Sequence, residues 1–270
     1  MIQARVCDVH RYYRSGGIDW DKLRMNFDAV IISAGVGMNA NPLLPEQVSG
    51  AVAHGVPYMT YHLPSPVFPM STQVEFYLGL YGVKDSATCI DIEPPVSNGS
   101  IRCINAAEAL TYIKAVENAT GKKPIVYSNP KYINEAIKRP LWLADYWLWI
   151  AQWPYDILTS LFRNYDRFMA KYANAYPPFV KGPVWKTNTL LWQFTCKGDA
   201  QALCANATTA DPVYKVGIKD ADLNVSTLDK AIYLSMLNTP QPVPIPESWE
   251  QRVDAFLRPQ GFTGPGPEAG

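Results

Sequence analysis

The stretch "TCIDIEPP", residues 88–95, joins a short apolar segment to two carboxylates and two prolines. The residues before Asp91 are typical of a buried strand, and Pro94 ends it, because proline has no N–H to donate to a neighbouring strand. Side chains two residues apart on a strand point to the same face, so we expect Asp91 and Glu93 to lie side by side. A buried strand that ends in two neighbouring carboxylates indicates a functional site at that end.

Outward from this stretch, strand-length apolar runs alternate with helix-length amphipathic segments. Strands are predicted at 4–9, 27–33, 56–62, 87–93, 123–128, 146–153, 189–195 and 216–223. Helices are predicted up to Gly55 and at 71–80, 105–120, 130–138 and 227–237. The alternation favours parallel strands wrapped by helices, and about eight strands fit a complete or partial β/α barrel better than an open sheet. No Gly-x-Gly-x-x-Gly follows the first strand, which argues against a dinucleotide-binding fold.

The chain divides into a folded body and a proline-rich end. Residues 1–237 are predicted to form one α/β domain. Within it, residues 154–188 form a long connection, for which a helical insertion with its own small core is favoured over a lid across a cleft. Residues 238–270 carry seven prolines and are predicted to form an extended linker or tail. Such a linker often leads to another module, so a further module after the tail stays open.

The charge balance supports neither nucleic acid nor an anionic membrane as a partner, because Lys plus Arg and Asp plus Glu number 24 each. No segment approaches the roughly 18 apolar residues of a membrane span. The opening "MIQARVCDVHRYYR" has no apolar run after its first charge, so no signal peptide is expected. The 8 Trp and 16 Tyr suit a groove that stacks on sugar rings, and equally suit a large core.

Acidic residues recur at the ends of the predicted strands. Asp8 ends the first, Asp91 and Glu93 end the fourth, and Asp222 lies near the end of the last. The active site of a β/α barrel lies at the carboxyl ends of its strands, so the four are expected to converge. Close carboxylates raise the pKa of at least one by roughly one to several units. A protonated acid beside ionised ones is what glycoside hydrolysis requires. Any one of these residues alone is more often a helix cap or a surface residue.

Metals and cofactors find little support in the sequence. His10, His54 and His62 show no ligand spacing, and no Cys-x-x-Cys is present among the five cysteines. We therefore expect no cofactor and no metal, while a calcium or magnesium site built from the carboxylates stays open. His62, in "TYHLP", is predicted to be a hydrogen-bonded residue at a strand end rather than a ligand.

Several segments resemble, in order along the chain, the glycoside hydrolase family 25 lysozymes, the Chalaropsis-type muramidases of bacteria and phages. They are "CDVHRYYRSGGIDWDKL", "FDAVIISAGVG", "AVAHGVPYMTYHLP", "CIDIE", "ATGKKPIVYSNPKYI", "LWIAQW", "LLWQFT" and "DADLN". The resemblance covers about residues 4–237. It implies an irregular, flattened, TIM-barrel-like β/α barrel with an acidic groove. It also implies hydrolysis of the β-1,4 bond between N-acetylmuramic acid and N-acetylglucosamine, and hence cell-wall lysis.

The resemblance also assigns roles to residues. Glu93 would be the general acid, and Asp91 would orient or stabilise the substrate. Asp8 and Asp222 would tune and position the reacting groups. The strand-end aromatics expected to line the groove, with core packing as the alternative, are Tyr61, Tyr127, Trp149 and Trp192.

The implied partner is the peptidoglycan glycan strand, reached by phage-encoded release or by secretion through another route. Two other functions stay open. A chitinase-like enzyme would place a further Asp where Cys89 stands. A wall-binding module of the same fold would have kept the four acids and lost the activity.

Overall fold

The computed structural model describes residues 3–10, 18–93, 103–154, 165–172, 188–199 and 220–237, with the backbone alone at 165–167, 196–199 and 220–221. Its strands are β1 (Gln3–Val9), β2 (Ala29–Val36), β3 (Asn39–Ala40), β4 (Tyr58–Leu63), β5 (Ala87–Asp91), β6 (Ile125–Ser128), β7 (Leu148–Ala151), β8 (Thr189–Asp199) and β9 (Asp220–Asp229). Its helices are α1 (Trp20–Asn26), α2 (Leu44–Ala53), α3 (Met70–Gly79), α4 (Ala106–Thr120), α5 (Tyr165–Tyr172), α8 (Lys230–Met236), the π-helix η2 (Tyr132–Ala136) and the 3₁₀-helix η3 (Leu141–Asp145).

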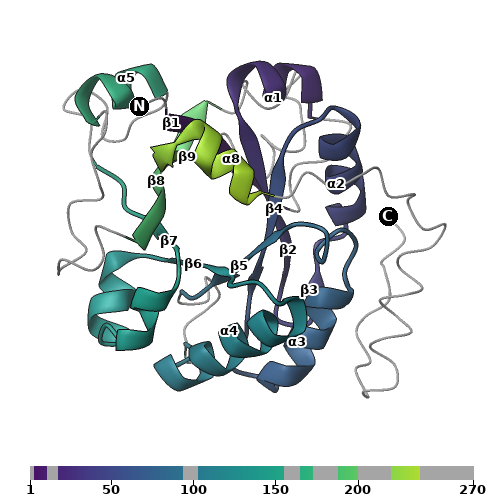
Figure 1. Cartoon of the computed structure of the whole chain (residues 1–270), viewed down its shortest axis with the longest axis vertical. Helices are drawn as coiled ribbons and strands as arrows, with labels where there is room; N and C mark the ends of the chain where they lie inside the picture. The colour runs from purple at the N-terminus through teal and green to yellow at the C-terminus, as the bar shows by residue number, and fades with distance from the viewer. Residues whose placement is uncertain are drawn as a thin grey trace.

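Eight of the strands close into a barrel. The order is β1-β9-β8-β7-β6-β5-β4-β2, and β2 pairs again with β1, while β3 forms a short hairpin on β2. The helices between the strands lie around this barrel (Figure 1). The predicted single-domain α/β barrel is therefore confirmed.

The last strand departs from the predicted parallel arrangement. β9 is antiparallel to both of its neighbours, β1 and β8. It is also longer than the predicted strand at 216–223, because it continues to Asp229, and α8 begins only at Lys230. An antiparallel strand reverses which of its ends faces the mouth of the barrel. The beginning of β9 therefore lies beside the carboxyl end of β1, where Asp222 pairs with Asp8.

Side chains alternate between the inside of the barrel and the layer under the helices, as the period of two in a strand requires. In β1, Ala4 and Val6 belong to the interior cluster, whereas Cys7 and Val9 pack in the cluster that also contains the helix residues. Asp8 is two residues after Val6, so its side chain also points into the barrel. The interior cluster also includes Ala29, Ile31, Met59, Cys89, Ile125, Tyr127, Trp149 and Leu191.

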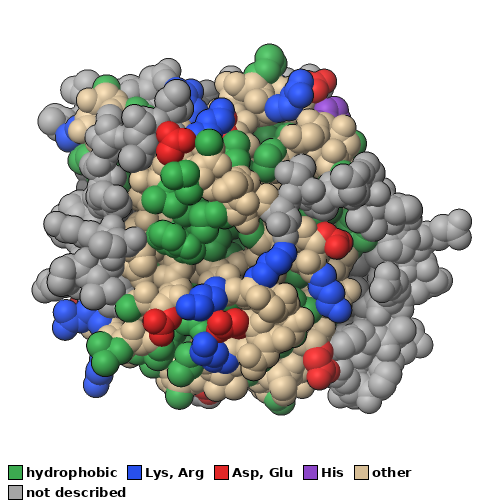
Figure 2. Space-filling view, in the orientation of Figure 1, with side chains coloured by type: hydrophobic (Ala, Val, Ile, Leu, Met, Phe, Trp, Pro, Cys, Tyr) green, Lys and Arg blue, Asp and Glu red, His purple; other side chains and the backbone are tan. Residues whose placement is uncertain are grey.

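Helix α8 closes the end of the barrel opposite Asp8. Its fully buried Tyr233 and the following Leu237 join the interior cluster together with Ala4 at the start of β1. A salt bridge between Lys230 and Asp28 fixes the beginning of α8 to this end. Figure 1 shows α8 lying across the barrel, and Figure 2 shows hydrophobic side chains gathered over and beside it on that face. This packing leaves the other end of the barrel as the one available for a site.

Local signals set the ends of the best-predicted helix. Asn105 caps α4 by accepting from the N–H groups of Ala107 and Glu108, and Glu108 reaches back to the N–H of Asn105. Gly121 ends the helix in the left-handed conformation at φ 67°, which favours glycine. The predicted boundaries of this helix are confirmed.

The predicted insertion, residues 154–188, is described only at its first residue, at α5 and at its last residue. Phe168 of α5 stacks on Phe194 with ring centroids 3.9 Å apart and meets Trp192 edge to face. This described part packs on the outer face of β8, where Phe168 belongs to the core cluster that also contains the helix residues. The predicted tail, residues 238–270, lies outside the described residues. None of the described helices is long and apolar enough to cross a membrane.

Candidate active site

The four predicted acids meet in one cavity of about 380 Å³ at the mouth of the barrel. Asp8 comes from β1, Asp91 is the last residue of β5, and Asp222 comes from the beginning of β9. Glu93 follows β5 by two residues, because the strand ends at Asp91 and not at 93 as predicted. No lysine or arginine is among the described residues that line this cavity. The other residues that line it are His10, Tyr61, Tyr127, Trp149, Trp153 and Gln193.

Asp222 reaches the cavity for a reason different from the predicted one. It was expected near the carboxyl end of a parallel strand, but it lies near the beginning of the antiparallel β9. The reversal brings that beginning to the mouth of the barrel, directly across from Asp8. Asp222 also contributes a hydrogen bond to Asp8, which requires that one of the two carboxyls keeps a proton.

Two amides bind the buried carboxylate of Asp8. Asn224 donates from Nδ2 to Asp8 Oδ2 over 2.9 Å, and Gln193 donates from Nε2 to the same oxygen over 3.2 Å. Both amides are buried and both come from the strands that follow β7. Neither was predicted as a site residue.

Aromatic donors fix the orientation of these amides. The Trp149 indole N–H donates to Asn224 Oδ1 over 2.7 Å, and the Tyr127 hydroxyl donates to Gln193 Oε1 over 3.1 Å. An indole N–H can only donate, so Asn224 must turn its oxygen to Trp149 and its NH₂ to Asp8. Oδ2 of Asp8 is therefore an acceptor, and any proton on Asp8 is directed to its other oxygen.

Burial raises the pKa of three of the acids. The pKa of Asp8 rises to about 6 through burial, against the lowering effect of the hydrogen bonds from Asn224, Gln193 and Asp222. The pKa of Glu93 rises to about 7, through burial first and then through the charge of Asp8. The pKa of Asp91 rises well above its ordinary value through burial, then through the charges of Glu93 and Asp8. The site therefore holds protons near neutral pH.

These shifts predict how stability depends on pH. A carboxyl whose pKa is higher in the folded state binds more protons when folded, so stability falls as pH rises from the unfolded pKa to the folded one. For Glu93 that window runs from 4.5 to about 7. We expect Glu93→Gln to match the wild type at pH 4.5 and to exceed it at pH 8 by on the order of 2 kcal/mol in the free energy of unfolding.

Urea unfolding at the two pH values measures this difference. Glu75→Gln, at an exposed position of α3, is the matched control and should leave the pH dependence unchanged. Equal stability of wild type and Glu93→Gln at pH 8 would show that Glu93 ionises in the folded protein without cost.

Three of the four predicted aromatics line the cavity, namely Tyr61, Tyr127 and Trp149. Trp149 meets Tyr127 at 4.4 Å and Tyr61 at 6.1 Å between ring centroids, so the three form one wall. Trp192 does not belong to it. It is fully buried against Phe168 of α5 on the outer face of β8.

The misplacement of Trp192 follows from strand parity. Neighbouring residues of a strand point to opposite faces, and Gln193, next to Trp192, is the one that points into the barrel. Choosing the aromatic residue in "LLWQFT" meant missing the amide beside it. Asn224 had a clearer signal, because it stands two residues after Asp222 on the same strand.

Trp153 was also missed as a site residue. It lines the cavity with 43% of its surface exposed, and its indole N–H donates to Gln193 Oε1 over 3.3 Å. It was assigned to a predicted strand, whereas β7 ends at Ala151. An exposed indole at the rim of a cavity suits a flat, partly apolar ligand such as a sugar ring.

His62 lies outside the cavity, in the layer under the helices. Its Nε2 lies 2.8 Å from the carbonyl oxygen of Gly37, and its Nδ1 lies 2.7 Å from the hydroxyl of Tyr112. Burial lowers the pKa of His62 to about 4, so it is neutral at pH 7. The predicted hydrogen-bonded role is confirmed. Among the described residues, no group of three or more His, Cys, Asp or Glu is arranged to hold a metal.

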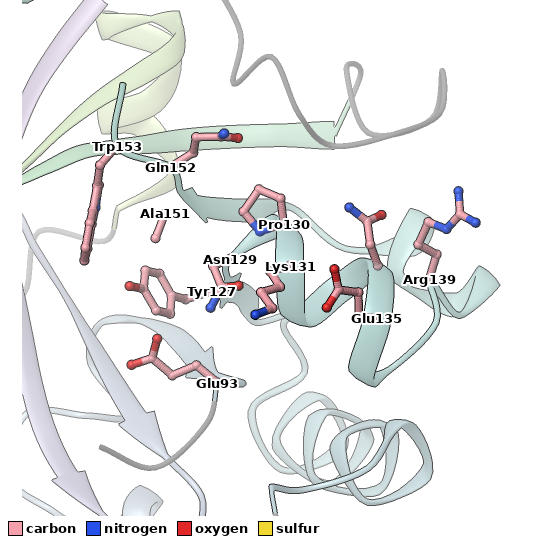
Figure 3. Close-up of a pocket in the computed structure, with 11 residues that line it drawn as sticks. Glu93, Tyr127, Asn129, Pro130, Lys131, Glu135, Arg139, Ala151, Gln152 and Trp153 are labelled. Carbon is pink, nitrogen blue, oxygen red and sulfur yellow. The ribbon is translucent and has the colours of Figure 1, made fainter. Parts of the chain in front are cut away.

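A second, larger cavity of about 720 Å³ adjoins the first. Glu93, Tyr127 and Trp153 line both, so the two form one continuous depression. Figure 3 shows Glu93 and Tyr127 at one end of it and the π-helix segment that follows β6 along its side. A chain of linked rings running across the mouth would therefore pass Glu93.

The role of Trp149 as an orienting residue can be tested by Trp149→Phe, which removes the N–H that holds Asn224. We expect a loss of about 1–3 kcal/mol in stability, from the unpaired buried amide and the lost packing. We also expect a severalfold fall in kcat for the glycan hydrolysis that the family resemblance implies, with KM nearly unchanged, because Asn224 would no longer be fixed toward Asp8.

The matched control is Trp142→Phe, which removes a half-buried indole that meets Tyr146 edge to face on the outside of the barrel. It should leave kcat unchanged. A similar fall in kcat in both variants would mean that general loosening, rather than the orientation of Asn224, limits the activity.

Comparison with known proteins gives one family. The sequence model of the family described as Glycosyl hydrolases family 25 matches residues 7–203. That range contains Asp8, Asp91 and Glu93, and it ends before Asp222. No curated protein matches the chain.

Solved structures with the same fold come from bacteria, fungi and phages. The bacterial lysozyme from Streptomyces coelicolor has a TM-score of 0.62 at 16% identity, over 87% of this chain and 97% of that one. A family GH25 lysozyme from Aspergillus fumigatus has a TM-score of 0.61 at 16% identity, over 87% and 98%. The catalytic domain of an endolysin from bacteriophage P40 of Listeria monocytogenes has a TM-score of 0.59 at 18% identity, over 87% and 98%. At these identities the likeness establishes the barrel fold.

Proposed function

Because the chain belongs to glycosyl hydrolases family 25, we propose that it is a lysozyme-type muramidase. It would hydrolyse the β-1,4 bond between N-acetylmuramic acid and N-acetylglucosamine and so act on the cell wall. The observation that carries the proposal is the meeting of four carboxyl groups in one cavity whose described lining contains no lysine or arginine. Glycoside hydrolysis uses such groups, one as proton donor and another to stabilise or attack the anomeric carbon.

Glu93 is the proton donor in this proposal. It is the most accessible of the three acids at β1 and β5, since Asp8 and Asp91 are 4% and 5% exposed and Glu93 is half-buried. Its pKa, raised to about 7, keeps most Glu93 carboxyl groups protonated below pH 7. It also lines both cavities, so a glycosidic oxygen between two bound sugars would lie within its reach.

Asp91 stabilises the positive charge that develops as the bond breaks. Its Oδ1 is buried, and no hydrogen-bond partner for it is found among the described residues. That oxygen is left to accept a hydrogen bond from the substrate, for instance from the acetamide N–H of the sugar. Once substrate binds, the ionised form of Asp91 gains a partner, which favours its charge.

Asp8 and Asp222 act as a pair behind the reacting groups. The hydrogen bond between them and the two amides on Asp8 hold the pair in place. The charge of Asp8 raises the pKa of both Glu93 and Asp91. The pair therefore helps to keep the proton on the acid.

The proposal is tested by digesting purified peptidoglycan and identifying the new reducing ends by mass spectrometry. Reducing ends at muramic acid support muramidase action. Reducing ends at glucosamine would show that the protein is a glycosidase that cleaves a different bond of the glycan. No products from several wall types, with binding to the wall retained, would favour the inactive wall-binding module of the same fold.

A further inference from the structure

The larger cavity differs in charge from the one that holds the acids. Its wall is formed by the segment 129–139, which follows β6 and contains η2, and by the end of β7. Lys131 and Arg139 both line it, whereas the acid cavity has neither residue type among its described lining. Figure 3 shows Lys131 near the Glu93 end and Arg139 at the far end. Among the described residues that line the two cavities, the cations therefore lie in the larger one only.

These cations are available to a ligand. Lys131 and Arg139 are exposed, and neither takes part in a salt bridge among the described residues. Glu135 on the same segment can offset one of them. Within residues 129–139, however, Lys131, Lys138 and Arg139 outnumber that single carboxylate. The segment therefore presents a net positive charge beside the acids.

One neutral side chain on the same wall, Asn129, is directed as a donor. Asn129 Oδ1 accepts the backbone N–H of Tyr132 over 2.9 Å, which leaves the Asn129 NH₂ free to donate. Asn134 and Gln152 each bury their side-chain oxygen without a hydrogen-bond partner among the described residues. These two unpaired oxygens are acceptors, so they do not add to the donors of this wall. The two cations and the Asn129 NH₂ together favour a ligand that supplies oxygen acceptors and negative charge.

The backbone holds this arrangement in an unfavourable conformation. Lys138 and Arg139 have φ of 57° and 52°, in the left-handed region that costs energy for residues with a Cβ. The Arg139 N–H closes the turn on the carbonyl oxygen of Ile133 over 2.8 Å. The preceding turn is a π-helix, a form that recurs at functional sites. A glycine would relieve such a turn, yet the chain keeps two cations there.

We propose that this cavity is a subsite for an anionic substituent of the glycan, with Lys131 and Arg139 as its cations. The proposal rests on the proposed action on peptidoglycan. It adds that the enzyme prefers strands that carry charge over bare sugar. Two anionic groups in walls have this chemistry, the carboxylates of the peptide stems and the phosphodiesters of attached polymers.

The test compares wild type with Lys131→Gln, Arg139→Gln and the double variant on insoluble cell wall. Lys122→Gln is the matched control, because Lys122 is exposed beside β6 at the opposite end of the barrel and its loss changes the net charge equally. Rates are measured against substrate concentration. Binding is measured separately by sedimentation with the wall, with Glu93→Gln added to each protein to prevent digestion. Thermal unfolding checks that every variant is folded.

We expect the double variant to raise KM about tenfold and to weaken sedimentation to a similar degree, with kcat within about twofold of wild type. Lys122→Gln should match wild type. Three treated walls then identify the anion: phosphodiesters removed with acid, carboxylates amidated with a neutral amine, or both. On the wall that has lost the recognised anion, wild type should fall to the level of the double variant.

Other results would overturn the proposal. If all three variants equal wild type in KM and in binding, the cations recognise nothing. If the loss persists on the doubly treated wall, the cations support structure rather than an anion. A wild type that digests no wall but binds through Lys131 and Arg139 would end the muramidase proposal and leave the anion subsite in place.

Discussion

Replacement of Glu93 by Gln is expected to lower kcat by about 10²–10⁴-fold, the usual contribution of a general acid. The substitution keeps the size of the side chain and removes its proton-donating carboxyl. Glu93 is the half-buried acid shared by the two cavities, with a pKa raised to about 7 by burial and by Asp8. Binding to the wall should be kept, because the Gln side chain fills the same space.

The pH profile supplies an independent check of this role. A general acid must be protonated in the free enzyme, so kcat/KM of the wild type should fall as pH rises through about 7. The residual activity of Glu93→Gln should lack that fall. Glu75→Gln, exposed on α3, is the control and should keep both the rate and the profile. A Glu93→Gln enzyme with more than a tenth of the wild-type kcat would exclude Glu93 as the acid.

Replacement of Asp91 by Asn is expected to lower kcat by about 10²–10³-fold, as removal of one electrostatic stabiliser does in other enzymes. Asp91 is buried with an oxygen that has no partner among the described residues, and in the proposed role it becomes ionised when substrate binds and stabilises the developing cation. Asn has nearly the same shape and cannot supply that charge. The variant should fold, and it should be at least as stable as wild type, because it no longer buries an ionisable group with a raised pKa.

An activated substrate separates the roles of the two acids. In a nitrophenyl glycoside the leaving group departs as nitrophenolate without being protonated. The Glu93→Gln variant should therefore recover much of the wild-type rate on this substrate. Asp91→Asn should not recover, because the positive charge on the sugar still develops. Recovery of both variants, or of neither, would contradict the assignment of separate roles to Glu93 and Asp91.

The sequence identified the acids more securely than their surroundings. Asp91 and Glu93 could be found because a strand, a two-residue spacing and two prolines are all local features. Asp8 followed from the same kind of pattern. Gln193 and Trp153 could not be found in this way, because their importance comes from contacts with residues far away in the chain, such as the bond from Gln193 to Asp8.

Asp222 shows how a position can be predicted correctly from an incorrect premise. The apolar pattern located a strand near it but did not indicate the direction of that strand. Direction depends on which neighbours the strand pairs with, and that is decided by long-range hydrogen bonds between β9 and both β1 and β8. Trp192 shows the opposite case, in which the strand was right and the face of the strand was wrong.

The sequence by itself determined the elements, because helix caps, glycine stops and apolar periods act over a few residues. It therefore specified the alternation of strands and helices and the carboxylates at their ends. The tertiary structure alone decided the closure of the barrel, the reversal of β9 and the amide network around Asp8. It also decided the separation of the acid cavity from the cavity that contains Lys131 and Arg139. These features depend on which distant segments lie together, and no local pattern encodes that.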